Sequence, residues 1–213
     1  DFFAARNKHK DSLNFRRSKE IYRNYNDGLY KFDQLYRIFC ENADTADTSG
    51  WEILKPLRSK IEDVYSNWFL DSLALKWESS INPQSWTIED KANQYDFFEK
   101  HVRKVAGVKT SRGSRTAYVI VSDALRYEAA EELTGVLNGK YRFTAKLESM
   151  LGVVPSYTAL GMAALLPHNE LGFTEKGDVL VNQKKCVSSQ QRRDVLGKVK
   201  GNLIKADELL DMK

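Results

Sequence analysis

The run from Tyr118 to Glu128 constrains the fold of this chain more than any other stretch. It opens with Tyr-Val-Ile-Val-Ser, a short apolar sequence rich in β-branched side chains that is typical of a buried strand. Asp123 ends that strand, and an amphipathic helical pattern begins at once. In an α/β protein such a junction lies at the carboxyl edge of the sheet, where ligands bind. The sequence therefore predicts a ligand site beside Asp123.

A second junction of the same kind follows at Thr158, which precedes the small-residue helical run Ala159–Leu166. Between the two junctions, residues 142–148 alternate apolar and polar side chains, as expected of a strand with one exposed face. Strand, helix and strand in this order predict a parallel pair with a right-handed crossover. Asp123 and Thr158 are then expected to emerge at the same edge of the sheet.

Both junction residues also have an interpretation that needs no ligand. The side chains of Asp123 and Thr158 are good N-caps, because their oxygens accept hydrogen bonds from the free N–H groups of a first helical turn. For Asp123 the pattern alone favours the cap. The same two groups suit phosphoryl or sulfuryl transfer, since a carboxylate binds a hard cation and an activated hydroxyl is a nucleophile. A residue can also fill both roles.

Residues 1–106 form a predicted helical region, because apolar residues recur there at alternating three- and four-residue spacing. One stripe comprises Tyr22, Tyr25, Leu29, Phe32, Tyr36 and Phe39, and another runs from Leu57 to Trp77. These aromatic residues are candidates for a surface that stacks on nucleic-acid bases, but side chains at helical spacing are expected to be core. Residues 107–116 are polar and contain glycine, which predicts a linker, and residues 117–213 form the predicted α/β part.

Composition narrows the class of protein. A hydrophobic content of 42% is enough for a real core, and no apolar run reaches the roughly 20 residues of a membrane helix. Cys40 and Cys186 form neither a metal-ligand pair nor a disulfide framework, so we expect a cytoplasmic protein. The chain begins at Asp1 rather than Met, and we expect it to be a fragment. The net charge of +4 is mild; basic clusters such as Arg192–Arg193 suit phosphate contacts, and solvated surfaces explain them equally well.

Two segments resemble the PglZ family, which belongs to the alkaline phosphatase superfamily and is a component of BREX phage-defence systems. The first is Val121-Ser-Asp-Ala-Leu-Arg-Tyr-Glu-Ala-Ala-Glu-Glu-Leu133. The second, longer and more specific, is Met150-Leu-Gly-Val-Val-Pro-Ser-Tyr-Thr-Ala-Leu-Gly-Met-Ala-Ala-Leu-Leu-Pro-His168. The helical block from Tyr65 to Trp77 is similar to the region that precedes the catalytic domain in type A members.

The resemblance implies an α/β alkaline phosphatase-like domain with a parallel sheet, incomplete in this chain and preceded by an all-α helical region. It implies that Asp123 is a metal ligand and that Thr158, at the same metal, is the nucleophile, with Ser156 a weaker candidate. The cofactor is expected to be a divalent metal, zinc first, in the full-length parent. The superfamily's later Asp and His ligands are not found after His168, so the chain alone is expected to be inactive.

The function implied for the parent is that of a metal-dependent phosphoesterase or nuclease in phage defence. Its expected partners are other BREX components such as the methyltransferase, together with DNA, and not a membrane. The alternative is a non-catalytic interaction scaffold for BREX partners or DNA. A generic α/β domain whose junctions are only helix caps is a third interpretation. Within the motifs, Arg126 is expected to bind Glu128 or a neighbouring carboxylate rather than phosphate, and His168 is expected to be a surface or capping residue.

Overall fold

The computed structural model describes residues 1–48, 54–111 and 113–211, and these pack as two compact units. Unit 1 comprises Asp1–Glu89 and Ala124–Ser149, and unit 2 comprises Asp90–Asp123 and Met150–Lys213. The units thus divide the chain differently from the predicted segments 1–106, 107–116 and 117–213. Those boundaries concern the domains of a longer protein and stay a prediction. Residue 112 of the predicted linker lies outside the described residues.

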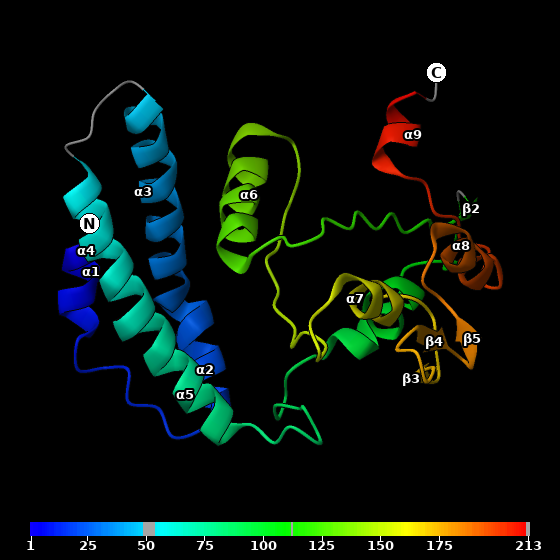
Figure 1. Cartoon of the computed structure of the whole chain (residues 1–213). Coiled ribbons are helices and arrows are strands. Elements are labelled where there is room, and N and C mark those ends of the chain that lie inside the picture. Colours follow the sequence, from blue (N-terminus) through cyan, green and yellow to red (C-terminus); the bar gives the residue numbers. More distant parts are fainter. Residues whose placement is uncertain (49–53, 112, 212–213) are drawn as a thin grey trace. The chain divides into compact units, whose positions relative to one another are not determined.

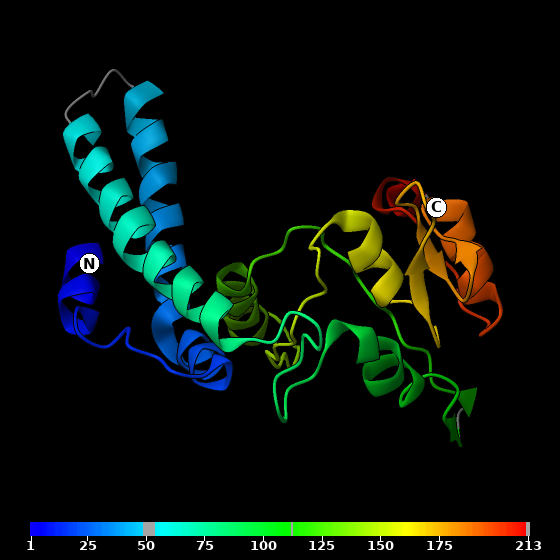
Figure 2. The ribbon, with the colours of Figure 1, turned by 60° about the horizontal axis from the view of Figure 1, so that its bottom comes forward.

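Unit 1 is built from helices (Figure 1): α1 (Phe2–His9), α2 (Ser18–Asn24), α3 (Tyr30–Thr48), α4 (Lys55–Asp63), α5 (Asp71–Ser80) and α6 (Tyr127–Lys140). The π-helical turn η1 (Tyr25–Leu29) joins α2 to α3, and a second such turn, η3 (Val64–Leu70), joins α4 to α5. Helix α3 and the rod made by α4, η3 and α5 lie side by side in both ribbon views (Figures 1 and 2). The predicted helical character is confirmed for most of residues 1–48 and 54–80, whereas residues 90–106 belong to unit 2 and contain only short helical turns and a β-bridge.

The aromatic stripes form the core of unit 1. Phe32 is almost completely buried, and its ring contacts those of Phe2, Trp68 and Phe69, with centroids 4.7–5.9 Å apart. Tyr36 stacks on Tyr65 at 3.9 Å. The interpretation of these stripes as core is therefore confirmed. Their rings pack against one another and do not form a surface on which nucleic-acid bases could stack.

A polar network runs through this core and centres on Asp33, whose exposed fraction is 4%. The carboxylate accepts hydrogen bonds from the hydroxyls of Tyr25 and Tyr65, each at 2.5 Å. The Nη2 atom of Arg126 lies 3.0 Å from Asp33 Oδ1. Burial and the hydrogen bond to Asp33 raise the pKa of Tyr65 to about 12. Arg126 is thus engaged with a carboxylate, as predicted.

A second ion pair fastens α6 to α3. Glu128 has no exposed surface, and its carboxylate accepts hydrogen bonds from Nε and Nη2 of Arg37 at 3.0–3.1 Å. Arg37 Nη2 also donates to Glu132 at 2.6 Å. A buried carboxylate is tolerated when its charge is paired and its lone pairs are occupied. The sequence around Asp123 therefore contributes two residues, Arg126 and Glu128, to the polar core of unit 1.

Unit 2 contains short helices and antiparallel strands. Its helices are the 3-10 turn η4 (Gln94–Asp96), the π-helical turn η5 (Phe98–Arg103), α7 (Thr158–Ala164), α8 (Ser189–Gly197) and α9 (Ala206–Leu210). The two sheets are the hairpin β1 (Lys109–Thr110) with β2 (Gly113–Ser114), and the order β3 (Leu171–Phe173), β4 (Val179–Val181), β5 (Lys184–Lys185). The hairpin predicted around residues 182–184 is confirmed, and its turn residues Asn182 and Gln183 have φ of 49° and 66°, as a two-residue hairpin requires.

The core of unit 2 forms where α7 packs on the sheet (Figure 2). Leu160, Ala163 and Ala164 of α7 are buried against Val179 and Val181 of β4. Two of the three helix residues are alanine, so the helix axis approaches the strands closely. The predicted small-residue helix is therefore formed, and it packs on an antiparallel sheet.

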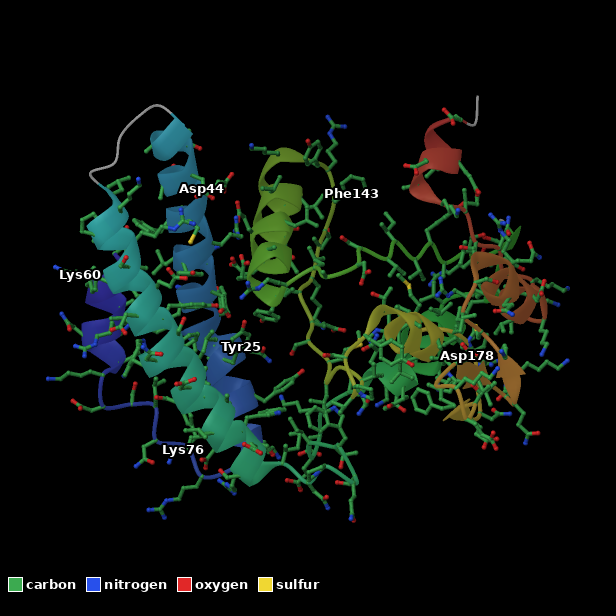
Figure 3. All side chains as sticks on the ribbon, viewed as in Figure 1. Tyr25, Asp44, Lys60, Lys76, Phe143 and Asp178 are labelled. Carbon is green, nitrogen blue, oxygen red and sulfur yellow. The ribbon has the colours of Figure 1, made fainter. Side chains whose placement is uncertain are left out.

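The two strands predicted at 117–122 and 142–148 are not formed, so the predicted parallel sheet is absent from the described residues. Ile120 and Tyr118 are 95% and 89% exposed, and Phe143 lies on the segment after α6 with an exposed ring (Figure 3). A strand needs ladder partners along its edge, and an isolated strand is unstable in water. The apolar pattern predicted a strand at each position, but among the described residues no neighbouring strand pairs with either segment.

Further observations bear on the class of protein. Within the described part of the chain, no helix combines the length and the hydrophobicity that crossing a membrane would take. Cys40 and Cys186 are free thiols, and Cys186 is buried in the core of unit 2. Burial raises the pKa of the Cys186 thiol, so this residue acts as a packing side chain.

Replacing Arg37 by Met tests the ion pair between α3 and α6. The substitution leaves Glu128 buried without its bidentate partner, and breaking a buried pair costs about 3–5 kcal/mol. Because Arg37 is 35% exposed, we expect a loss near the lower end of that range in urea unfolding followed by circular dichroism. The control is Arg17→Met, which breaks the exposed pair with Glu20 and should cost less than about 1 kcal/mol. Equal losses in both variants would contradict the assigned role.

Candidate functional site

Asp123 and Thr158 meet directly in unit 2. Thr158 Oγ1 donates a hydrogen bond to Asp123 Oδ2 at 3.0 Å, although the residues are 35 positions apart in the chain. The predicted proximity of these side chains is confirmed. The parallel strands expected to bring them together are not formed, and the contact is made instead between a turn and the start of α7. Their chemical roles stay a prediction.

Neither residue occupies the N-cap position that the alternative interpretation requires. The N-cap of α6 is Arg126, and the N-cap of α7 is Tyr157, with no side-chain cap hydrogen bond at either. Thr158 is instead the first residue inside α7, and its hydroxyl points to the carboxylate of Asp123. The interpretation of these two residues as N-caps alone is therefore wrong.

The backbone turns sharply after Asp123. Ala124 has φ of +56°, in the left-handed region that residues with a β-carbon occupy at a cost of about 1–2 kcal/mol. Non-glycine residues in this region persist where the surrounding structure holds them, and they concentrate at functional sites. The turn is consistent with a carboxylate that is held in a defined direction.

Sequence analysis missed Gln94, which borders the Thr158 segment. Its Oε1 accepts a hydrogen bond from the Val153 N–H at 3.2 Å, and its Nε2 donates to the Gly161 carbonyl at 3.0 Å. Residues 90–105 belong to the predicted helical region, but there the structure has only the short elements η4 and η5, and Asn93 pairs with Leu151 in a parallel β-bridge. Nothing in the local sequence distinguishes Gln94 from a surface glutamine, because its partners are distant in the chain.

The remaining motif residues do not join Asp123 and Thr158. Ser156 is exposed in the loop before α7. His168 is half-buried, its Nδ1 lies 2.7 Å from the Leu166 carbonyl beyond the end of α7, and its ring lies against that of Tyr95; its expected role as a surface or capping residue stays a prediction. Arg126 belongs to the Asp33 network described above. Among the described residues, the candidate site is formed by the Asp123 carboxylate and the Thr158 hydroxyl, and the Gln94 amide bonds the backbone on both flanks of Thr158.

The donors of this site suit a divalent metal but do not complete a coordination shell. Carboxylate and hydroxyl oxygens are hard ligands, and the hydrogen bond already places Asp123 Oδ2 and Thr158 Oγ1 at 3.0 Å. A catalytic zinc usually has three protein ligands. Within residues 1–48, 54–111 and 113–211, no cluster of three or more His, Cys, Asp or Glu side chains is arranged to hold a metal. Further ligands would have to come from elsewhere in a longer protein.

Comparison with known proteins gives one family. A family model described as the BREX system PglZ alkaline phosphatase-like domain matches residues 97–213. The chain is 41% identical, over 98% of its length, to the alkaline phosphatase-like protein BrxZ of Escherichia coli O9:H4 (strain HS). It is 34% identical, over 84% of its length, to the alkaline phosphatase-like protein PglZ of Bacillus cereus (strain H3081.97). The chain spans 24% and 20% of these two curated relatives. No solved structure matches.

The ligand count predicts weak metal binding by this chain alone. In a competition titration with a chromophoric chelator of micromolar affinity, zinc should stay bound to the chelator. A carboxylate and a hydroxyl supply fewer ligands than a zinc site needs. Residual binding seen by calorimetry should disappear in Asp123→Asn. It should persist in Asp178→Asn, since Asp178 pairs with Lys185 at 2.6 Å. Tight binding that survives the loss of Asp123 would show that other groups hold the metal.

Proposed function

Because this chain belongs to the PglZ family of BREX alkaline phosphatase-like proteins, we propose that it carries part of the active site of a metal-dependent phosphoesterase or nuclease of phage defence. The hydrogen bond between Thr158 Oγ1 and Asp123 Oδ2 is the observation that supports this proposal most strongly. The chain spans a minor part of its curated relatives, so the activity is proposed for the whole protein.

Thr158 is the proposed nucleophile. Attack of its Oγ1 on phosphorus breaks the bond from phosphorus to one substrate oxygen, which takes up the threonine proton and leaves as the first alcohol. Water then attacks the resulting phosphothreonine ester, restores the hydroxyl and releases the remaining phosphate monoester. The position of Thr158 supports this role, because the first residue of a helix has a fixed backbone and its hydroxyl is held by one hydrogen bond. Ser156 is the weaker candidate, since it lies in the loop before α7 and the hydrogen bond to Asp123 is made by Thr158 instead.

A divalent metal, with zinc as the first candidate, is the proposed cofactor. A bound cation lowers the pKa of a coordinated hydroxyl and stabilises negative charge on phosphoryl oxygens. Asp123 and Thr158 would hold it with their facing oxygens, and residues outside this chain would supply the remaining ligands. Asp123 also orients the hydroxyl of Thr158 before any metal is bound, because it already accepts that hydrogen bond.

The exposed apolar segments support a further part of the proposal. We expect 117–122 and 142–148 to be strands of a parallel sheet in the whole protein, where residues beyond this chain supply the ladder partners. Ile120 and Tyr118 are almost fully exposed here, and contiguous exposed apolar surface marks places that another element covers. An α/β alkaline phosphatase-like domain completed in this way would place Asp123 at the carboxyl end of a strand.

An interaction scaffold is the second candidate function, with other BREX components such as the methyltransferase, or DNA, as proposed partners. The two candidates differ in what they require of the rest of the whole protein: Asp and His ligands there favour the enzyme, and their absence there favours the scaffold. For DNA, cations gather in the segment around η5 and the β1–β2 hairpin, but Lys100 and Arg103 already pair with Asp96 and Glu99. Hydrolysis by the whole protein distinguishes the enzyme from the scaffold.

The decisive assay is zinc-dependent hydrolysis of bis(p-nitrophenyl) phosphate by the whole protein. Asp123→Ala and Thr158→Val should each lower kcat by about a thousandfold or more, as loss of a nucleophile or its activating group does elsewhere. Thr158→Ser keeps a hydroxyl and should retain much of the activity, and Ser156→Ala should resemble the wild type. Full turnover in Thr158→Val would exclude this residue as the nucleophile. An inactive wild type, with manganese and magnesium also supplied, would favour the scaffold.

Hydrogen exchange tests the proposed sheet independently of activity. Amides of residues 118–121 should exchange rapidly in this chain, where they belong to no strand, and slowly in the whole protein, where ladder hydrogen bonds would protect them. The amides of α3 should be protected in both and serve as the internal reference. Equally rapid exchange at 118–121 in the two proteins would rule out their pairing in a completed sheet.

A further inference from the structure

The amide of Gln94 binds the chain on both sides of Thr158. Val153 precedes Thr158 and donates its N–H to Gln94 Oε1, while Gly161 follows Thr158 and accepts from Gln94 Nε2. We propose that Gln94 is a positioning residue for Thr158, and this proposal rests on the nucleophilic role proposed above. It acts through the loop and the first turn of α7, without touching the reacting atoms.

The orientation of the Gln94 amide follows from its partners. The Val153 N–H needs an acceptor and the Gly161 carbonyl needs a donor, so oxygen and nitrogen can be assigned only one way. The Leu165 N–H, which would be the regular helical partner of the Gly161 carbonyl, donates to the Ala163 carbonyl instead, so Gln94 supplies a donor to Gly161 near the end of α7. Gln94 therefore satisfies two backbone groups that the segment 153–161 leaves open.

The backbone of Gln94 is itself fixed. Its N–H donates to the Leu151 carbonyl at 2.9 Å, and the Leu151 N–H donates to the Ala92 carbonyl at 2.8 Å. This bridge places the side chain beside the loop, so the amide reaches both partners without extending across solvent.

The apolar core fixes the depth of this segment but not its direction. Val153 and Leu160 are buried, yet apolar contacts are non-directional and leave a helix free to rotate or slide slightly. Between them, Val154 and Tyr157 are exposed. Hydrogen bonds from one rigid amide to both flanks set the direction, which matters because a displacement of about 1 Å at a reacting group can cost a hundredfold in rate.

Gln94→Glu is the sharpest test, because it preserves size and the acceptor for Val153 while removing the donor to Gly161. In the whole protein, we expect kcat for bis(p-nitrophenyl) phosphate to fall about ten- to a hundredfold, with KM changed less than about twofold. Amides of 154–161 should exchange faster. The matched control is Gln190→Glu, because the Gln190 amide bonds only to Asp194 on the exposed face of α8; it should leave both measurements unchanged.

These measurements distinguish a failure of the positioning role of Gln94 from a failure of the proposed enzymatic function. Wild-type kcat in Gln94→Glu would overturn the positioning role, as would a loss of turnover that merely follows a lower melting temperature with unchanged exchange at 154–161. Gln94→Ala, which removes both bonds without adding charge, should reproduce the fall in kcat if lost positioning rather than the new carboxylate is the cause. If the wild type is inactive, the proposed function fails, and faster exchange confined to 154–161 would then show an ordering role without a catalytic one.

Discussion

Two buried carboxylates, Asp33 and Glu128, impose the constraint on which unit 1 depends. Each has lost its hydration, so its charge must be matched by fixed donors: Tyr25, Tyr65 and Arg126 for Asp33, and Arg37 for Glu128. Apolar packing alone would allow α6 several rotations about its axis against α3. The ion pairs allow one rotation, because any other would leave a charge buried and unpaired. Such pairs restrict how α6 docks on α3, and removing one partner leaves an unpaired buried charge, which is destabilising.

The polar residues of the first motif, Asp123-Ala-Leu-Arg-Tyr-Glu128, divide between the fold of unit 1 and the candidate site. Asp123 contacts Thr158, whereas Arg126 and Glu128 serve the polar core of unit 1. Arg126 is held by Asp33 and Tyr65, and therefore has little freedom to bind a phosphate group. In unit 2, Gln94 bonds both flanks of the segment that bears Thr158. Gln94 lies just before the residues that the family model matches.

The order of residues along the chain correctly predicted features that depend on neighbouring residues in the sequence. The three- and four-residue spacing of Tyr25, Leu29 and Phe32 correctly predicted a buried helical stripe, and the turn residues at 182–183 correctly predicted a hairpin. The proximity of Asp123 and Thr158 was also predicted, but through parallel strands that the described residues do not form. An apolar β-branched run such as 118–121 states only that a strand is favoured if a neighbour exists. Gln94 escaped notice because an amide acquires its role from partners that are remote in sequence.

Unit 1 is assembled from two separate stretches of the chain, so its parts cannot be exchanged independently in evolution. The helical core is completed by α6, which lies within residues 97–213 matched by the family model, whereas most of that core precedes them. A recombination breakpoint between the amino-terminal helices and the phosphatase-like segment would separate Asp33 and Arg37 from the residues that neutralise them. The two parts are therefore not exchangeable modules, and substitutions at Asp33 and Arg126, or at Arg37 and Glu128, are expected to co-vary among relatives.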